Sequence, residues 1–260
     1  MHKIKSAFLI LSVMLGIFTA CAEKPEQVTL DDIKARGEII VGVKNDVPYF
    51  SYYDSISGGY SGYEIELAQM IAEDLFGSRD SISFVPVTTK TRPVKLSNGE
   101  IDMAIATFTI TEERIDNFNF SPSYYADFTG LLVMADSGIR DISDLNGKSV
   151  GVMQNSSAGK SINEAAANLG ISVRIVTYAT YDDIQQAVLA RRCDAFCTDR
   201  AILKGYMTED TLITPDRFSP QNYAVATKKE NIELAAYIDG LISKWDGDGT
   251  LDALKTKYGI

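Results

Sequence analysis

The sequence predicts an α/β protein organised as two lobes. Short apolar runs typical of strands alternate along the chain with amphipathic segments of helical spacing, which is the pattern of βαβ units. The 260 residues are enough for two domains of ordinary size, and 45% hydrophobic with 23% charged residues is a globular composition. The alternation alone does not say which segments share a lobe.

The first twenty residues are expected to be an export signal. Two lysines precede an apolar run over residues 7–18 that is too short to span a membrane comfortably, and small residues lead up to Cys21. The segment resembles the signal of bacterial lipoproteins, which would make Cys21 the lipidated, palmitate-bearing first residue of the mature protein. Phe18 stands where such signals usually carry leucine, so a plain signal peptide cut nearby is the alternative. Residues 21–30 would form a polar tether.

Charge and histidine content exclude several classes of function. The net charge is −10, and loss of the two lysines of the signal makes it more negative, so nucleic acid is not an expected partner. The only histidine is His2, which would be removed with the signal. That loss excludes serine–histidine and cysteine–histidine nucleophiles and histidine-containing metal sites. Most of the common hydrolase designs are thereby excluded. We expect no catalytic residues, no metal and no cofactor.

Cys193 and Cys197 are the remaining cysteines, and both fall in or beside an expected strand. Four residues of strand separate Cα atoms by roughly 13 Å, beyond the reach of a disulfide. The spacing is not that of a zinc site either. We expect two separate, buried thiols.

In the first part of the folded body, helices and strands are expected to alternate. Thr29 caps the first helix and Gly37 closes it, while apolar residues at helical spacing mark the core side of the second helix. A proline turn over residues 45–50 and a glycine-rich loop over residues 57–62 separate the two. The expected helices cover residues 29–37, 64–76 and 93–98, and the expected strands cover residues 38–43 and 82–87.

Residues 101–114 carry the most chemistry. Their first half alternates apolar and small residues as a buried strand does, and Thr111 opens a helix three residues before Arg114. Thr107 and Thr109 would lie at the carboxyl end of the strand, where open α/β sheets bind ligands. Arg114 supplies a planar fork for a carboxylate. The alternative is that these threonines are ordinary caps and the arginine a solvated surface charge.

Two more cations stand at the ends of elements. Arg92 precedes Pro93, which begins a helix, and a basic residue beside the exposed N–H groups of a first turn suits an anion. Lys44 follows the first expected strand.

The second part of the chain repeats the alternation. Residues 153–157 are expected to cap a helix that stops at Gly170. Gly-Lys-Ser at residues 147–149 is no phosphate loop, because no glycine stands at position 142 and a strand follows. The expected strands cover residues 130–134, 149–153, 172–176, 194–198 and 221–227, and further helices cover residues 184–192 and 232–245.

Three runs of sequence resemble the signature of the family 3 extracellular solute-binding proteins, the polar amino-acid receptors of ABC importers. They cover residues 106–114 (Ala-Thr-Phe-Thr-Ile-Thr-Glu-Glu-Arg), 119–125 and 130–133, and the likeness extends over residues 30–260. The resemblance implies a two-lobed, type II periplasmic-binding-protein-like fold with a two-strand hinge. Lobe 1 would comprise residues 31–124 and 224–260, the hinge residues 125–129 and 219–223, and lobe 2 residues 130–218.

The same resemblance implies which residues hold the ligand. Arg114 would take the α-carboxylate with Thr109 and N–H groups near Ser156 and Ser157, and Asp199 the α-ammonium with Thr107. Phe50 matches an aromatic that lies against the ligand in the family, although a core aromatic is an equal alternative. The full set of expected ligand-binding residues is Lys44, Phe50, Arg92, Thr107, Thr109, Arg114, Ser156, Ser157, Tyr181 and Asp199.

Within the family, the chain most resembles aspartate- and glutamate-binding members. Lys44 stands where many relatives of other specificity carry aspartate, and with Arg92 it would place two cations opposite the ligand side chain. Tyr181 matches a tyrosine of the acidic amino-acid receptors. The expected ligand is therefore L-aspartate or L-glutamate, with cysteine, cystine or another polar amino acid as the alternative.

The resemblance also implies the mechanism and the partners. A monomeric, lipid-anchored receptor on the outer face of the cell membrane or in the periplasm would close about its hinge and deliver the amino acid to a permease driven by ATPase subunits. Two other roles remain open. One is an enzyme like the cyclohexadienyl dehydratases, which share the scaffold, although Asp199 in place of glutamate argues against it; the other is a sensor or adhesin.

Overall fold

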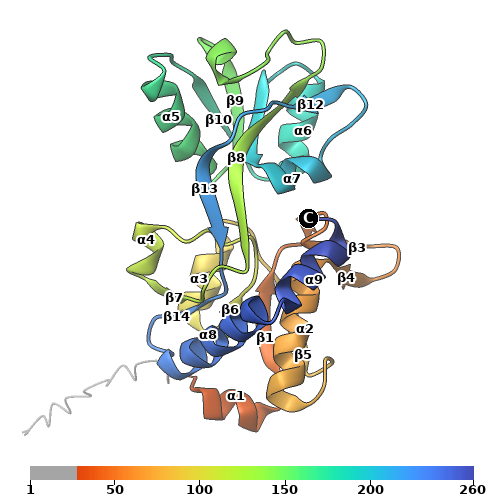
Figure 1. The fold of residues 1–260 in the computed structure, drawn as a ribbon, viewed down its shortest axis with the longest axis vertical. Coiled ribbons are helices and arrows are strands. Elements are labelled where there is room, and N and C mark those ends of the chain that lie inside the picture. The colour runs from red at the N-terminus through yellow and green to blue at the C-terminus, as the bar shows by residue number, and fades with distance from the viewer. Residues whose placement is uncertain (1–27) are drawn as a thin grey trace, which may run out of the picture.

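The computed structural model describes residues 28–260. The predicted signal peptide, Cys21 and most of the tether lie outside the described residues. Two α/β lobes are stacked along the long axis of the molecule and joined by a pair of strands (Figure 1). Over the described range, no helix has the length and apolar character needed to cross a membrane.

Lobe 1 is built on a five-stranded sheet that combines both ends of the folded chain. Its strand order is β5-β1-β6-β14-β7, in which β1 runs parallel to β5 and β6 while β14 is antiparallel to β6 and β7. The strands are β1 (Ile39–Val43), β5 (Ile82–Pro86), β6 (Met103–Ala104), β7 (Phe118–Phe120) and β14 (Ala226–Lys228). The C-terminal part of the chain therefore completes a sheet that the N-terminal part begins.

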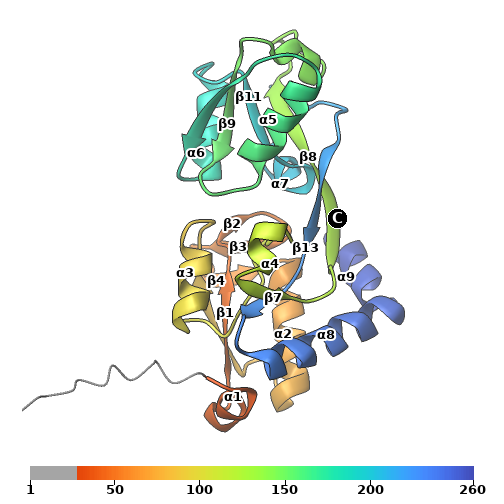
Figure 2. The ribbon, with the colours of Figure 1, turned by 90° about the vertical axis from the view of Figure 1, so that its left-hand side faces the viewer.

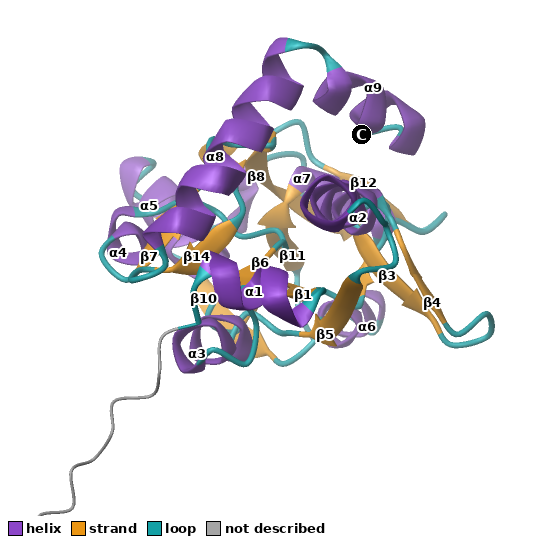
Figure 3. Ribbon diagram, turned by 90° about the horizontal axis from the view of Figure 1, so that it is seen from below, coloured by secondary structure: helices purple, strands orange, loops and turns teal. Residues whose placement is uncertain are grey.

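Six helices accompany this sheet. Helix α3 lies on one side of it, and α2 and α8 lie on the other (Figures 2 and 3). The helices are α1 (Leu30–Arg36), α2 (Tyr63–Phe76), α3 (Thr91–Asn98), α4 (Glu112–Ile115), α8 (Ile232–Gly247) and α9 (Thr250–Tyr258).

Lobe 2 is built on a second sheet with strand order β10-β9-β11-β8-β12, and β13 also pairs with β8. Helix α5 lies on one side of it, and α6 and α7 lie on the other (Figure 1). The strands are β8 (Tyr125–Met134), β9 (Ser149–Met153), β10 (Arg174–Tyr178), β11 (Ala195–Asp199), β12 (Thr211–Ile213) and β13 (Phe218–Tyr223). The helices are α5 (Ala158–Asn168), α6 (Tyr181–Leu189), α7 (Arg200–Gly205) and the short 3₁₀ helix η1 (Ile142–Leu145).

The two lobes are connected by β8 and β13, which run side by side and antiparallel between them (Figures 1 and 2). Their register pairs Tyr223 with Tyr125 at the lobe 1 end. Backbone bonds from Ile110 N–H to Asn222 O (2.9 Å) and from Ala224 N–H to Phe108 O (3.1 Å) tie this ribbon to the segment after β6. Movement of the hinge and the position of that segment are therefore linked.

Several expected elements have other bounds in the structure. The predicted strand 221–227 is two strands, because the chain leaves the hinge after Tyr223 and enters the other sheet at Ala226. The strand predicted for 172–176 lies two residues later, and the predicted closing helix is followed by a second helix, α9. The strand predicted within residues 101–106 is only two residues long, since Thr107 has a φ of 46° and turns the chain out of the sheet.

A third, small sheet replaces the expected turn and glycine-rich loop. It consists of β2 (Asp46–Val47), β3 (Ser51–Asp54) and β4 (Gly59–Ser61), paired in that order. Gly62 closes it with a φ of 127°, and a Cβ there would lie 2.3 Å from the carbonyl oxygen of Phe50. Only glycine fits this position.

Other local predictions are confirmed. Thr29 and Asp32 form a capping box at the start of α1, and Gly37 ends this helix in the left-handed conformation. Helix α2 covers all of residues 64–76. Cys193 and Cys197 are buried free thiols, although Cys193 precedes β11 rather than lying in it.

Hydrogen bonds join the two lobes at several places. The Thr89 hydroxyl donates to Gln154 O (2.7 Å), and the Tyr206 hydroxyl donates to Asp46 O. The Lys204 ammonium donates to Gly259 O (2.9 Å), which links α7 to the C-terminal end of the chain. The structure is thus a closed arrangement of the lobes.

Candidate functional site

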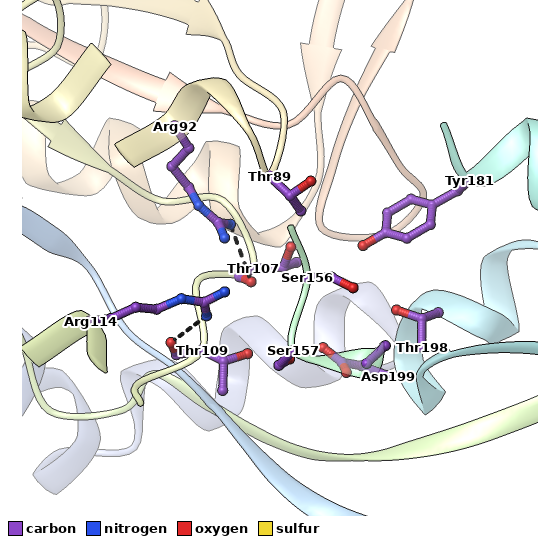
Figure 4. Close-up of a pocket in the computed structure, with 11 residues that line it drawn as sticks. Thr89, Arg92, Thr107, Thr109, Arg114, Ser156, Ser157, Tyr181, Thr198 and Asp199 are labelled. Carbon is purple, nitrogen blue, oxygen red and sulfur yellow. Dashed lines mark hydrogen bonds between the residues drawn. The ribbon is translucent and has the colours of Figure 1, made fainter. Parts of the chain in front are cut away.

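A small cavity lies between the lobes (Figure 4). Lobe 1 contributes the start of α3, the segment that follows β6, and helix α4. Lobe 2 contributes the starts of α5 and α6 and the end of β11. Its lining consists of Thr89, Arg92, Thr107, Thr109, Arg114, Ser156, Ser157, Ala158, Tyr181, Thr198 and Asp199. Eight of the ten expected ligand-binding residues are therefore brought together.

The two arginines enter from lobe 1 and share one aromatic neighbour. The guanidinium carbon of Arg92 lies 3.6 Å from the ring centroid of Phe108, and that of Arg114 lies 4.8 Å from it. Arg92 Nη1 donates to Ala106 O, and Arg114 Nη1 donates to Thr109 O (2.7 Å). Cation–π contact and carbonyl acceptors hold both side chains in place without neutralising them.

The charges of these arginines remain uncompensated by any ion pair within residues 28–260. Burial, together with the positive charge of nearby Arg114, lowers the pKa of Arg92 to about 9. Burial also lowers the pKa of Arg114, against an opposing effect of Asp199. Two partly desolvated cations facing one cavity favour an anionic group there.

Asp199 faces the arginines from lobe 2, at the end of β11 (Figure 4). It is the only acidic residue of the cavity lining, and its Oδ2 accepts a hydrogen bond from the Tyr223 hydroxyl (2.5 Å). Burial raises the pKa of Asp199 to about 7, although the bond from Tyr223 opposes the rise. A ligand cation would stabilise the ionised form.

Thr107 and Thr109 follow β6 and form the lobe 1 edge of the cavity. The Thr107 N–H donates to Glu64 Oε1 (2.6 Å), and the Thr107 hydroxyl donates to Ala106 O (2.8 Å). Thr109 forms an isolated antiparallel bridge with Tyr223 of the hinge. The left-handed conformation of Thr107 is therefore fixed by several contacts.

The hydroxyl groups of lobe 2 complete the lining. Ser157 is the N-cap of α5, but its hydroxyl donates to Gln221 Oε1 (3.0 Å) instead of capping the helix. The Ser156 hydroxyl and N–H both donate to Met153 O, so this N–H is already used within the protein. Tyr181 opens α6 and points its hydroxyl into the cavity (Figure 4).

Lys44 and Phe50 do not line the cavity. Lys44 is buried, its Nζ lies 2.9 Å from Asp46 Oδ1, and it lies 5.3 Å from the ring centroid of Tyr181. Burial lowers the pKa of Lys44 while Asp46 opposes this effect, and the ion pair neutralises the charge expected to face a ligand.

Phe50 packs instead in an aromatic cluster at the base of the hinge. Its ring makes T-shaped contacts with Tyr125 at 4.9 Å and Tyr223 at 5.8 Å between centroids. This is the packing of a core aromatic.

Sequence reasoning missed four residues of the site region. Thr89 and Thr198 line the cavity, Phe108 packs against both arginines, and Glu64 accepts a hydrogen bond from the Thr107 N–H. Thr89 belongs to a threonine-rich turn before α3, which is a weak signal. No signal in the sequence pointed to Glu64, because a glutamate in the first turn of a helix is usually solvated.

A wider groove opens from the cavity between α3 and α4 on one side and the start of α5 on the other. The groove and the cavity share Thr89, Arg92, Arg114, Ser156 and Ser157, so the groove leads from solvent to the arginines. Across residues 28–260, no cluster of three or more histidine, cysteine, aspartate or glutamate side chains is arranged to hold a metal ion.

Comparisons with known proteins place this architecture among solute receptors. A family model described as bacterial extracellular solute-binding proteins, family 3, matches residues 39–260. The ABC transporter glutamine-binding protein of Bacillus subtilis (strain 168) is 32% identical over 99% of this chain and 97% of its own length. The glutamine-binding protein of Geobacillus stearothermophilus is 35% identical over 78% of this chain and 77% of its own length.

Solved structures agree with the fold. A cysteine-binding protein from Campylobacter jejuni superposes with a TM-score of 0.79 at 28% identity, covering 88% of this chain and 92% of its own. An ancestral amino acid-binding protein, described as a precursor of cyclohexadienyl dehydratase, has a TM-score of 0.78 at 28% identity, covering 88% and 98% of the two chains.

Proposed function

Because this chain belongs to the bacterial extracellular solute-binding proteins of family 3, we propose that it captures one free amino acid for an ABC importer. The observation that carries the proposal is the charge pattern of the cavity, where two guanidinium groups of lobe 1 meet one carboxylate of lobe 2. A free amino acid presents one carboxylate and one ammonium group, and burying either without a partner is costly. The cavity offers a partner for each.

In this proposal Arg114 binds the α-carboxylate and Asp199 binds the α-ammonium. Arg114 keeps free N–H groups beyond its bond to Thr109 O, and the hydroxyls of Ser156 and Ser157 lie across from it. Since Arg114 belongs to lobe 1 and Asp199 to lobe 2, a zwitterion bound to both residues links the two lobes. Closure excludes water and so strengthens both ion pairs.

For the ligand we propose a polar, uncharged side chain, with L-glutamine first. Lys44 is neutralised by Asp46 outside the cavity, which removes one of the two cations that favoured an acidic ligand. The rest of the lining is rich in hydroxyls, which both donate and accept hydrogen bonds as a carboxamide requires. Both relatives described above are glutamine-binding proteins, which supports the same choice.

L-aspartate and L-glutamate form the second candidate class. Arg92 lacks an ion pair in the described part of the chain, and its Nε is buried without a hydrogen-bond acceptor. A carboxylate on the ligand side chain would give Arg92 both an ion-pair partner and a hydrogen-bond acceptor. Cysteine and cystine come third, supported by the likeness to the Campylobacter cysteine-binding protein.

An enzymatic role is the alternative from another class. One structural neighbour is described as a precursor of a dehydratase. Asp199 is the acidic residue of the cavity lining; burial raises its pKa to about 7, while the Tyr223 hydroxyl and the two arginines oppose this rise and so favour its ionised form. A receptor that binds an ammonium group requires that form, whereas a general acid requires a proton.

The proposal includes an anchor and a membrane partner. Cys21 would carry the lipid after removal of residues 1–20, and the polar tether would give the closed receptor reach to a permease with its ATPase subunits. Globomycin, which blocks lipoprotein signal cleavage, tests the anchor: the lipid-linked precursor should accumulate, whereas normal processing in its presence would indicate a plain signal peptide.

Isothermal titration of residues 22–260, unfolded and refolded to remove carried ligand, tests the binding function with the twenty amino acids and cystine. We expect L-glutamine to bind with a micromolar or tighter dissociation constant, about −8 kcal/mol. Binding of only acidic amino acids, or only cysteine and cystine, would keep the receptor and replace its ligand. Binding of none, together with turnover of prephenate or arogenate, would replace the receptor by an enzyme.

A further inference from the structure

Glu64 occupies an unusual position in the first turn of α2. It is fully buried, although it lies outside the cavity lining. Its Oε1 accepts two hydrogen bonds, from the Thr107 N–H (2.6 Å) and from the Tyr124 hydroxyl (2.6 Å), while its Oε2 has no hydrogen-bond partner. A buried carboxylate with an unsatisfied oxygen costs stability. A role in function would explain its presence.

The two donors belong to the two parts of the molecule that a receptor must connect. Thr107 lines the cavity, whereas Tyr124 immediately precedes β8, the first hinge strand. The Tyr124 N–H in turn donates to Tyr223 O (2.9 Å) on the second hinge strand. One carboxylate oxygen of Glu64 therefore joins the edge of the cavity to the base of the hinge.

The second hinge strand makes an equivalent connection. The Tyr223 hydroxyl donates to Asp199, which lines the cavity from lobe 2. Each hinge strand thus has a tyrosine at its lobe 1 end whose hydroxyl donates to a buried carboxylate beside the cavity. The connected groups run from Thr107 through Glu64, Tyr124 and Tyr223 to Asp199 and return to the same cavity.

The surrounding charges favour the ionised form of Glu64 that accepts both bonds. Burial raises the pKa of Glu64 to about 7, and the Tyr124 hydroxyl, the Thr107 N–H and the positive charges of Arg92 and Lys44 all oppose this rise. Arg92 also lines the cavity. The carboxylate is therefore placed to respond to both the cavity and the hinge.

We propose that Glu64 is a positioning residue that couples the ligand cavity to the hinge, through its shared hydrogen bonds to Thr107 and Tyr124. The proposal rests on the proposed function, because it assigns a role within the same ligand-binding cycle. When Tyr124 is held by Glu64, Thr107 has the conformation that shapes the cavity. A change at the hinge then changes the cavity without any contact between Tyr124 and ligand.

Tyr124→Phe and Tyr63→Phe form a matched pair of variants for the test. Both tyrosines are fully buried, neither lines the cavity, and each substitution removes one hydroxyl. The Tyr124 hydroxyl binds Glu64, whereas the Tyr63 hydroxyl donates to Tyr124 O (2.8 Å) and holds the same hinge residue without reaching the carboxylate. Both variants should lower the thermal midpoint by similar amounts, about a few degrees.

The first readout is amide hydrogen exchange at Thr107 in the ligand-free protein. We expect Tyr124→Phe to speed this exchange about tenfold and Tyr63→Phe to change it less than about twofold, because only the first loosens the acceptor of the Thr107 N–H. Equal rates in the two variants would overturn the proposal. Hydrogen exchange tests the role of Glu64 even if no amino acid binds the wild-type protein. Absence of binding would instead contradict the proposed function.

The second readout is the dissociation constant of the amino acid that binds the wild-type protein. Tyr124→Phe should weaken binding about tenfold, while Tyr63→Phe should leave it within about twofold. In a Glu64→Gln background, the loss caused by Tyr124→Phe should shrink, since both changes act on one connection. Equal weakening by both tyrosine variants would show a general loosening of the hinge and overturn the proposal.

Discussion

The charged and polar residues of the cavity are held in position by neighbouring residues that do not line the cavity themselves. Phe108 keeps two arginines beside each other, Tyr223 holds Asp199, and Glu64 holds Thr107. Each of these neighbours is buried, so its position is fixed by packing rather than by the ligand. A site supported in this way is preorganised, which lowers the cost of ordering it on binding.

Replacing Arg114 tests the assignment of the α-carboxylate. Arg114→Ala is expected to weaken amino-acid binding by about 2–5 kcal/mol, because the ligand carboxylate would be buried without its partner. Arg140→Ala is the control, since Arg140 is an exposed arginine of lobe 2 that pairs with Asp144. Isothermal titration of the two variants measures the difference. Equal affinity of Arg114→Ala and wild type would remove Arg114 from the site.

The titration of Asp199 predicts how binding depends on pH. Burial raises the pKa of Asp199 to about 7, and Tyr223, Asp127, Arg114 and Arg92 also act on it. Below pH 7 an incoming ammonium group must displace a proton, so affinity should fall by up to about tenfold per pH unit and level off above pH 7. Titrations between pH 5.5 and 8 measure this profile.

The variant Asp199→Asn separates Asp199 from other groups that titrate in the same range. It should bind weakly and lose the pH dependence, because no proton is displaced. Glu64 is the main alternative source, since burial raises its pKa to about 7 as well. A pH profile that persists in Asp199→Asn and disappears in Glu64→Gln would assign the dependence to Glu64.

At the residue scale, the sequence predicted the groups that its motifs name and missed those that support them. Arg114, Thr107 and Thr109 follow a short strand within one recognisable run, and the structure places all three on the cavity. Lys44 was expected beside them, but its local partner Asp46, two residues away, pairs with it. Whether Lys44 faces the ligand cavity or pairs with Asp46 depends on the path of the chain between β1 and β2, and the sequence pattern does not specify this path.

Among the elements, α7 of lobe 2 lies directly against the turn after β2 of lobe 1. A Cβ added at Gly205 would lie 2.9 Å from the Cβ and Cγ atoms of Pro48. Proline is rigid, so a side chain at this position would push the lobes apart rather than be accommodated. The glycine at the end of α7 therefore permits the closed arrangement.

Gly205→Ala is expected to weaken amino-acid binding about tenfold although it lies outside the cavity. Gly240→Ala is the matched control, because Gly240 lies inside α8 and a Cβ there would have no atom within 4 Å. The control should stabilise its helix by about 0.5–1 kcal/mol and leave binding unchanged. Unchanged binding in Gly205→Ala would mean that the ligand complex does not bring α7 to Pro48.

Element boundaries were predictable where local chemistry decides them. The capping box of α1 and the apolar face of α2 are encoded within a few residues, and both match the structure. The small sheet β2–β3–β4 and the division between β13 and β14 depend instead on pairing with distant segments. Periodicity along the chain does not report such pairing.

At the scale of the whole molecule, neither lobe alone contains the complete set of charges. The arginines belong to lobe 1 and Asp199 to lobe 2, and the cavity exists where the lobes meet. The hinge strands β8 and β13 are part of the lobe 2 sheet, and β14 then returns the chain to lobe 1. Two α/β lobes were predictable from alternation, while this discontinuous arrangement followed only from the family resemblance.

The most direct test of the account is a titration with a zwitterion and with analogues that each lack one of its charges. L-glutamine is compared with its α-carboxamide, which lacks the α-carboxylate, and with its deaminated analogue, which lacks the α-ammonium. We predict that L-glutamine binds and that each analogue loses about a hundredfold in affinity, since each leaves Arg114 or Asp199 without a partner. An analogue that binds as tightly as L-glutamine would contradict the account that the two lobes close around the two charges of one amino acid.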